Sequence, residues 1–141
     1  MEKSDFKEVK NNDEILPGNR QLIICGFGNK DKLLLKKILL KSEFKTAVLF
    51  AENSDAAKLL SELNDTSALK KRASRSTFKS SLPRAVIAAG FTMRDFNNIM
   101  LKIKSSSIKK PMWATLTESS KKWTLKYLLE EMLQEQSLLG R

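Results

Sequence analysis

A run of basic side chains near the middle of the chain is the feature that most suggests a chemical role. Between residues 70 and 84 there are six cations and no acid, and Phe78 is the one aromatic side chain there. Cations spaced in this way can follow a phosphate backbone, and each contact releases counterions. The predicted nucleic-acid-binding residues are Lys70, Lys71, Arg72, Arg75, Lys79 and Arg84. The segment also fits a docking or phosphorylation site, because Arg72 and Arg75 closely precede serines, or an insertion without constraint.

The second candidate is a glycine-containing turn at residues 26–30 (GFGNK), between an apolar run and a helical pattern. Amides at a helix N-terminus can hold an anion, so Gly26, Gly28 and Lys30 are predicted to bind one. A dinucleotide-binding fingerprint needs a third glycine three positions after Gly28, where Asp31 stands instead. The alternative is a tight strand-to-helix turn that requires glycine.

Aromatic side chains form a third candidate. Trp113, Trp123 and Tyr127 are expected to lie near one another, and Phe27 and Phe91 occupy matching ends of two apolar runs. Such rings can stack on nucleic acid bases. They are more typical of core packing and of hydrophobic contacts that fix the start of a helix.

Several kinds of catalysis are excluded by composition. The chain has no histidine, so it cannot form a Ser-His-Asp triad or a Cys/His zinc site. Its one cysteine, Cys25, lies inside an apolar run and is interpreted as a small buried hydrophobe. The carboxylates Glu52, Asp95 and Glu118 have no recognisable acid-base partner. The sequence therefore indicates no catalytic residue, no metal ligand and no cofactor.

The charge of the chain favours an acidic partner. The formal net charge is +10 over 141 residues, which suits nucleic acid, an anionic membrane or an acidic protein. No apolar stretch approaches the length of a membrane span, and the first 20 residues lack the apolar core of a signal peptide. We therefore expect a soluble intracellular protein.

Apolar patterning predicts a single α/β domain over residues 21–139 behind a disordered leader, residues 1–20. A flexible basic loop is expected at 64–83. Strands are predicted at 21–27, 46–51, 84–91 and 112–117, and helices at 30–42, 54–63, 92–104 and from 124 onward. Ser54 and Thr92 are the expected helix caps, and Asp95 lies at the capping-box distance from Thr92.

Shifting the sequence by 64 positions places LIICGF (22–27) over VIAAGF (86–91), and a helix over a helix. This indicates an internal repeat of two β-α-β units that form a four-stranded sheet. Each crossover is expected to be right-handed, with its two strands parallel. Two arrangements remain open: a ferredoxin-like sheet, or a small doubly wound three-layer sandwich.

The C-terminal half also resembles a known family. The residues that carry the resemblance are the strand end WATLT (113–117), the helix start KWTL (122–125) and LLEE (128–131). They are similar to domain-of-unknown-function family 3783, found in bacteria and plants, over about residues 91–136. The resemblance implies a compact α/β domain and supplies no activity. A processed plant member would lie in an organelle such as the plastid stroma, and otherwise the cytoplasm is expected.

The leading hypothesis is a non-catalytic basic module that binds nucleic acid or a ribonucleoprotein. The alternative is a protein-interaction or assembly factor, with a homodimer as one form of it. A third hypothesis is an enzyme or sensor that binds a phosphorylated small molecule at residues 26–30.

Overall fold

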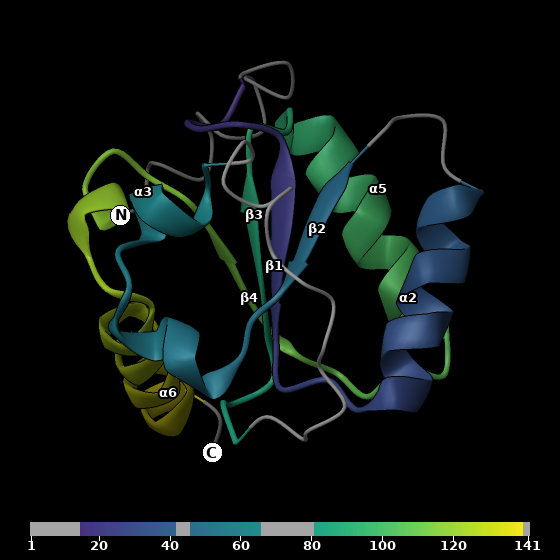
Figure 1. Cartoon of the computed structure of the whole chain (residues 1–141). Helices are drawn as coiled ribbons and strands as arrows, with labels where there is room; N and C mark the ends of the chain where they lie inside the picture. Colours follow the sequence, from purple (N-terminus) through teal and green to yellow (C-terminus); the bar gives the residue numbers. More distant parts are fainter. Residues whose placement is uncertain (1–14, 42–45, 66–80, 140–141) are drawn as a thin grey trace.

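The computed structural model describes residues 15–41, 46–65 and 81–139, which form a four-stranded sheet with helices on both faces (Figure 1). The strands are β1 (Gln21–Cys25), β2 (Ala47–Phe50), β3 (Ala85–Ala89) and β4 (Met112–Thr115). The helices are α2 (Asn29–Leu40), α3 (Leu60–Leu63), α5 (Met93–Lys104) and α6 (Leu125–Leu139), with two 3-10 helices, η1 (Asn53–Ala57) and η2 (Ser120–Lys122). The mixed α/β fold with a four-stranded open sheet is thereby confirmed.

The strand order decides between the two arrangements left open by the sequence. It is β2-β1-β3-β4, with β1 parallel to β2, β3 parallel to β4, and the central pair β1 and β3 antiparallel. The first unit (β1, α2, β2) therefore lies beside the second unit (β3, α5, β4). A ferredoxin-like sheet would interleave the strands of its two units. The chain adopts the three-layer arrangement instead, with α2 and α5 on one face and α3 and α6 on the other (Figure 1).

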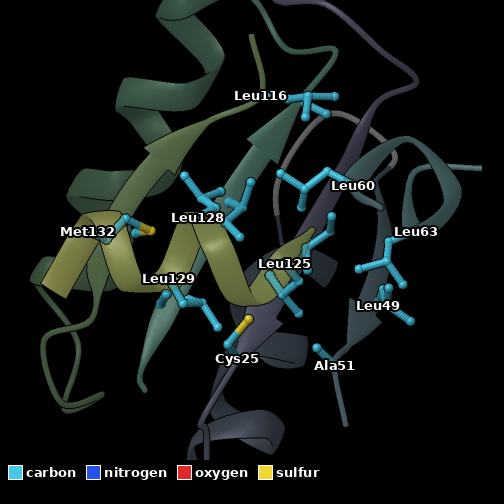
Figure 2. Close-up of a cluster of buried hydrophobic side chains, with 14 residues drawn as sticks. Cys25, Leu49, Ala51, Leu60, Leu63, Leu116, Leu125, Leu128, Leu129 and Met132 are labelled. Atoms are coloured by element: carbon cyan, nitrogen blue, oxygen red, sulfur yellow. The ribbon is translucent and has the colours of Figure 1, made fainter. Parts of the chain in front are cut away.

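The sheet separates two hydrophobic cores because successive side chains of a strand point to opposite faces. Leu22 and Ile24 of β1 pack with Leu35 of α2 and the apolar stripe of α5. Ile23 and Cys25 belong to the other core, which α6 and α3 cover (Figure 2). The buried side chains of α6 in that core are Leu125, Leu128, Leu129 and Met132.

Helix α5 begins as its sequence predicts. The Thr92 side chain accepts a hydrogen bond from the Asp95 backbone amide at 3.0 Å, which satisfies one of the free donors of the first turn. Phe91 and Phe96, on either side of the cap, are both buried in the core under α2 and α5. Helix α5 ends at Lys104, where the sequence places its end.

The helix predicted at 54–63 is wrong in part, because the segment forms η1 and α3 with a break between them. The residue before η1 is Glu52, whose backbone amide donates to Asp55, so Ser54 does not cap the segment. The break is made by tertiary pairing. The amide of Leu60 donates to the Trp123 carbonyl, and the amide of Leu125 donates to the Lys58 carbonyl.

The described part of the predicted leader, residues 15–20, lies against the end of β3. The Leu16 amide donates to the Phe91 carbonyl at 2.8 Å, and the Gly90 amide donates to the Pro17 carbonyl at 3.1 Å. These bonds place Arg20 beside the first turn of α5. The leader residues 1–14 and loop residues 66–80 lie outside the described residues.

Candidate functional site

The turn at residues 26–30 joins β1 to α2, and its two glycines have different roles. Gly26 has φ +74°, and a Cβ there would lie 2.5 Å from the Leu82 carbonyl oxygen, so a side chain is excluded. Gly28 has an ordinary φ of −78° and open space around it. Lys30 is exposed at the start of α2. The backbone therefore requires glycine at 26 and leaves position 28 free.

Arg84 and Asp31 join this turn to the second unit. The Arg84 Nη2 atom donates to the Asp31 carboxylate at 2.8 Å and to the Lys109 carbonyl at 2.7 Å. Its guanidinium also lies over the Phe27 ring, 4.5 Å from the centroid. Asp31 thus supplies a carboxylate at the N-terminus of α2. Arg84 is held in place by its contacts with Asp31, Lys109 and Phe27. Any anion approaching Gly26, Gly28 and Lys30 would meet this pair.

A second cluster of the same composition lies at the other end of the central strand pair. Arg20 Nη2 donates to the Asp95 carboxylate at 2.8 Å, and the Arg20 guanidinium lies 5.0 Å from the Phe91 centroid. Gly90 has φ +74°, like Gly26, and a Cβ there would clash with the Arg20 backbone. A charge-assisted hydrogen bond is stronger than a neutral one, and the cation-π contact adds a further attraction.

The two clusters are reciprocal between the units. Each arginine precedes the first strand of its own unit and pairs with the aspartate in the first helical turn of the other unit. Arg20, Phe27 and Asp31 stand 64 positions before Arg84, Phe91 and Asp95. Sequence reasoning missed both pairs. The signal available was this common offset, which extends the predicted repeat outward on both sides of the apolar strand.

Charge is distributed unequally between the two helical layers. We call α2, α5 and the helix-ending Lys41 the basic layer; among the described residues it carries eight cations and two acids. Both acids, Asp31 and Asp95, are paired with the arginines of the clusters. The cations of this layer are Lys30, Lys32, Lys36, Lys37, Lys41, Arg94, Lys102 and Lys104.

The opposite face has the reverse balance. We call residues 52–65 and 118–139 the acidic layer; in it, eight acids face four cations. Figure 1 shows the helices of the two layers on opposite sides of the sheet. Lys32 and Lys36 of the basic layer lie over the Phe50 ring, at 5.3 and 5.6 Å from its centroid. The described part of the molecule is therefore polarised across the sheet.

Most of the aromatic candidates are packed inside. Phe27 and Phe91 are buried, so their faces are closed to a base. Trp113 is half-buried and packs edge-on against Phe96, with ring centroids 6.1 Å apart. Tyr127 is exposed and lies edge-on to Trp123 at 4.7 Å.

The Cys25 side chain has the properties of a core residue. Burial, and secondarily the charge of Asp55, raise the pKa of this thiol to about 12, so it stays protonated at neutral pH, and the thiolate is the reactive form. Within the described ranges, no three His, Cys, Asp or Glu side chains gather as a metal site would require. In the same ranges, no helix has the length and apolar character needed to cross a membrane.

Five of the predicted nucleic-acid-binding residues lie outside the described residues. They are Lys70, Lys71, Arg72, Arg75 and Lys79. The sixth, Arg84, is described and belongs to the first cluster.

Comparison with known proteins places the C-terminal part of the chain in context. No curated protein and no solved structure matches the chain. A family model does match, and it spans β3, α5, β4, η2 and α6, which confirms the resemblance noted in the sequence. Residues 84–139 thus match the model of DUF3783, a domain of unknown function.

Proposed function

We propose that the chain is a non-catalytic binding module whose basic layer contacts the phosphates of a nucleic acid, free or within a ribonucleoprotein. The observation that carries the proposal is the charge difference between the two helical layers. The two acids of the basic layer are neutralised by Arg20 and Arg84, so its exposed lysines have no competing carboxylate of that layer.

The arrangement of α2 and α5 suits a polyanion. Both helices lie on the same face of the sheet, so their cations form one surface rather than two (Figure 1). Phosphate contacts from such a surface supply affinity without sequence selection. The acidic layer would repel the same ligand and orient it toward the basic layer. In this proposal the predicted basic loop adds further phosphate contacts, from Lys70 to Lys79.

The test is a fluorescence-anisotropy titration with labelled RNA and DNA oligomers at about 50 and 200 mM salt. One variant changes Lys37, Lys102 and Lys104 of the basic layer to Gln. A matched control changes Lys121, Lys122 and Lys126 of the acidic layer to Gln, so the net charge falls equally. A third variant changes Lys70, Lys71, Arg72 and Arg75 to Gln.

The basic-layer variant is expected to bind more weakly and to lose about 2 to 3 from the salt slope, because each lysine that contacts a phosphate contributes about 0.9. The control variant should keep most of the wild-type affinity and most of its salt slope. Equal losses in the two matched variants would show that net charge alone matters and would overturn the assignment to this layer. Absence of binding by the wild type would overturn the function itself.

We also infer that the two units derive from one repeated unit. Helices α2 and α5 both have 12 residues and begin 64 positions apart, at 29 and 93. The positive-φ glycines 26 and 90 keep the same spacing. A duplicated unit accounts for the reciprocal clusters, because each copy would bring the same arginine and aspartate to the central strand pair.

A further inference from the structure

The basic layer contains an apolar groove. It lies between α2 and α5, has a volume of about 440 Å³ and is lined by Ile38, Lys41, Leu101, Lys102 and Ser105. Leu101 is 61% exposed there, and Leu40 on the same layer is 84% exposed. Phosphate groups gain nothing from exposed leucines. An apolar floor with lysines at its edges instead suits a helix that has apolar and acidic side chains on one side.

The acidic layer offers a helix of this kind. Tyr127 and Leu138 of α6 are 46% and 74% exposed. They are 11 positions apart, which is three helical turns, so they lie on the same side of the helix. Glu130 and Glu131 lie between them along that side. The outward side of α6 is therefore apolar at both ends and acidic in the middle.

We propose that the chain associates head to tail, with the outward side of α6 of one copy in the α2–α5 groove of a second copy. The charges are complementary, since Lys41 and Lys102 would meet Glu130 and Glu131. The two surfaces lie on opposite faces of the sheet, so one copy cannot satisfy both by itself (Figure 1). A contact between two different surfaces does not close into a symmetric dimer, and the assembly grows with concentration.

The net charge of +10 opposes association, and this sets the conditions of the test. At about 0.15 M salt the screening length is about 8 Å, so repulsion between whole copies is weak, whereas contacting side chains still attract. The weight-average mass is measured by sedimentation in such a buffer, from about 10 to 500 μM protein. No nucleic acid is present, so the result is independent of the proposed function.

Two charge-reversal variants make the test specific. The groove variant is Lys41→Glu with Lys102→Glu, and the helix variant is Glu130→Lys with Glu131→Lys. The weight-average mass of the wild type is expected to rise with protein concentration, from the monomer mass of 16.0 kDa toward twice that value and beyond. Each variant alone should stay near the monomer mass. An equimolar mixture should associate again, because each groove then finds an α6 of opposite charge.

Other outcomes overturn the proposal. A wild type that stays monomeric over the whole range excludes it. Association that persists in the groove variant indicates a contact between two α6 helices or another surface. Failure of the mixture to associate shows that the two surfaces do not meet. The urea midpoint of each variant is measured first, to show that the variant is folded. The further variant Leu101→Ser keeps all charges, and it should also lower the weight-average mass if the groove is the contact.

Discussion

The two β-α-β units of this chain share the clusters that join them and differ at several other positions. Both have an arginine before the first strand, a glycine with φ +74° after it, a buried phenylalanine next and an aspartate in the first helical turn. Each of these arginines and aspartates contacts the other unit. Four positions that hold the two units together are therefore common to both.

One difference lies at the start of the helix of each unit. Helix α5 is capped by Thr92, whereas Gly28 precedes α2 without a side-chain cap. The paired strands at the boundary also differ, since β1 ends in Cys25 and β3 ends in Ala89. We infer that the side-chain contacts of the two clusters constrain a residue more strongly than backbone pairing between the strands does.

The largest expected effect comes from the two phenylalanines. Phe27→Ala and Phe91→Ala should each lower the free energy of unfolding by about 3–5 kcal/mol, because each leaves a cavity in the same core. Urea denaturation of the two variants provides the measurement. A loss at one position several times larger than at the other would show that the two turns are not equivalent.

The positive-φ glycines come next. Gly26→Ala and Gly90→Ala should each cost about 2–4 kcal/mol, because the backbone there is left-handed and a Cβ would meet the backbone of the segment that leads into the other unit's first strand. Gly28→Ala is the control and should cost at most about 1 kcal/mol, since its φ is ordinary and its surroundings are open. Thermal or urea unfolding of all three variants decides. Equal losses of stability in Gly26→Ala and Gly28→Ala would contradict the finding that only Gly26 has a positive φ and a crowded Cβ position.

The ion pairs between the units should contribute less. Asp31→Asn and Asp95→Asn are each expected to cost about 1–2 kcal/mol, because a charge-assisted hydrogen bond is weakened. A double-mutant cycle of Arg84→Gln with Asp31→Asn should show coupling. The cycle of Arg84→Gln with Asp95→Asn should be nearly additive, because these residues belong to different clusters. Coupling in the second cycle instead of the first would reverse the assignment of partners.

The helix caps give an effect of about 1 kcal/mol or less. Thr92→Ala should destabilise by about 1 kcal/mol, because it removes the hydrogen bond to the Asp95 amide. Gly28→Thr should stabilise by a few tenths of a kcal/mol, since the new hydroxyl can cap α2 in open space. Urea midpoints of the two variants measure both. Destabilisation by Gly28→Thr would mean that position 28 has a role beyond starting the helix.

The ionisation of Cys25 has the smallest expected effect on the free energy of unfolding at neutral pH. Its pKa is raised in the folded state from 9.0 to about 12, so the unfolded chain loses the thiol proton first as pH increases. The stability that comes from keeping this thiol neutral is fully present below pH 9 and is lost as pH rises from 9 toward 12. Wild type should therefore lose about 1 kcal/mol by pH 10 relative to Cys25→Ala. A constant difference between the two proteins from pH 8 to 10 would contradict a buried neutral thiol.

Much of the local structure could be predicted from the sequence because its causes lie nearby in the chain. The apolar runs around Ile23 and Ile87 predict the two central strands, and Thr92 predicts the start of α5. The break between η1 and α3 could not be predicted, because the groups that form it bond to residues more than 60 positions away. The Leu60 amide donates to the Trp123 carbonyl, and the Lys58 carbonyl accepts from the Leu125 amide. The partners of Arg20 and Arg84 could not be predicted either. The 64-residue offset identifies equivalent positions in the two units, but it does not say which residues are in contact.

The sequence by itself determined the fold class, the two β-α-β units, the excess of positive charge and the exclusion of histidine-based chemistry. These follow from composition and from periodicities that act over a few residues. Only the tertiary structure decided the strand order, the exchange of arginines between the units, and the separation of a basic layer from an acidic one. Each of these depends on the antiparallel pairing of β1 with β3. That pairing joins residues 60 to 68 positions apart, and the local sequence patterns are compatible with other pairings.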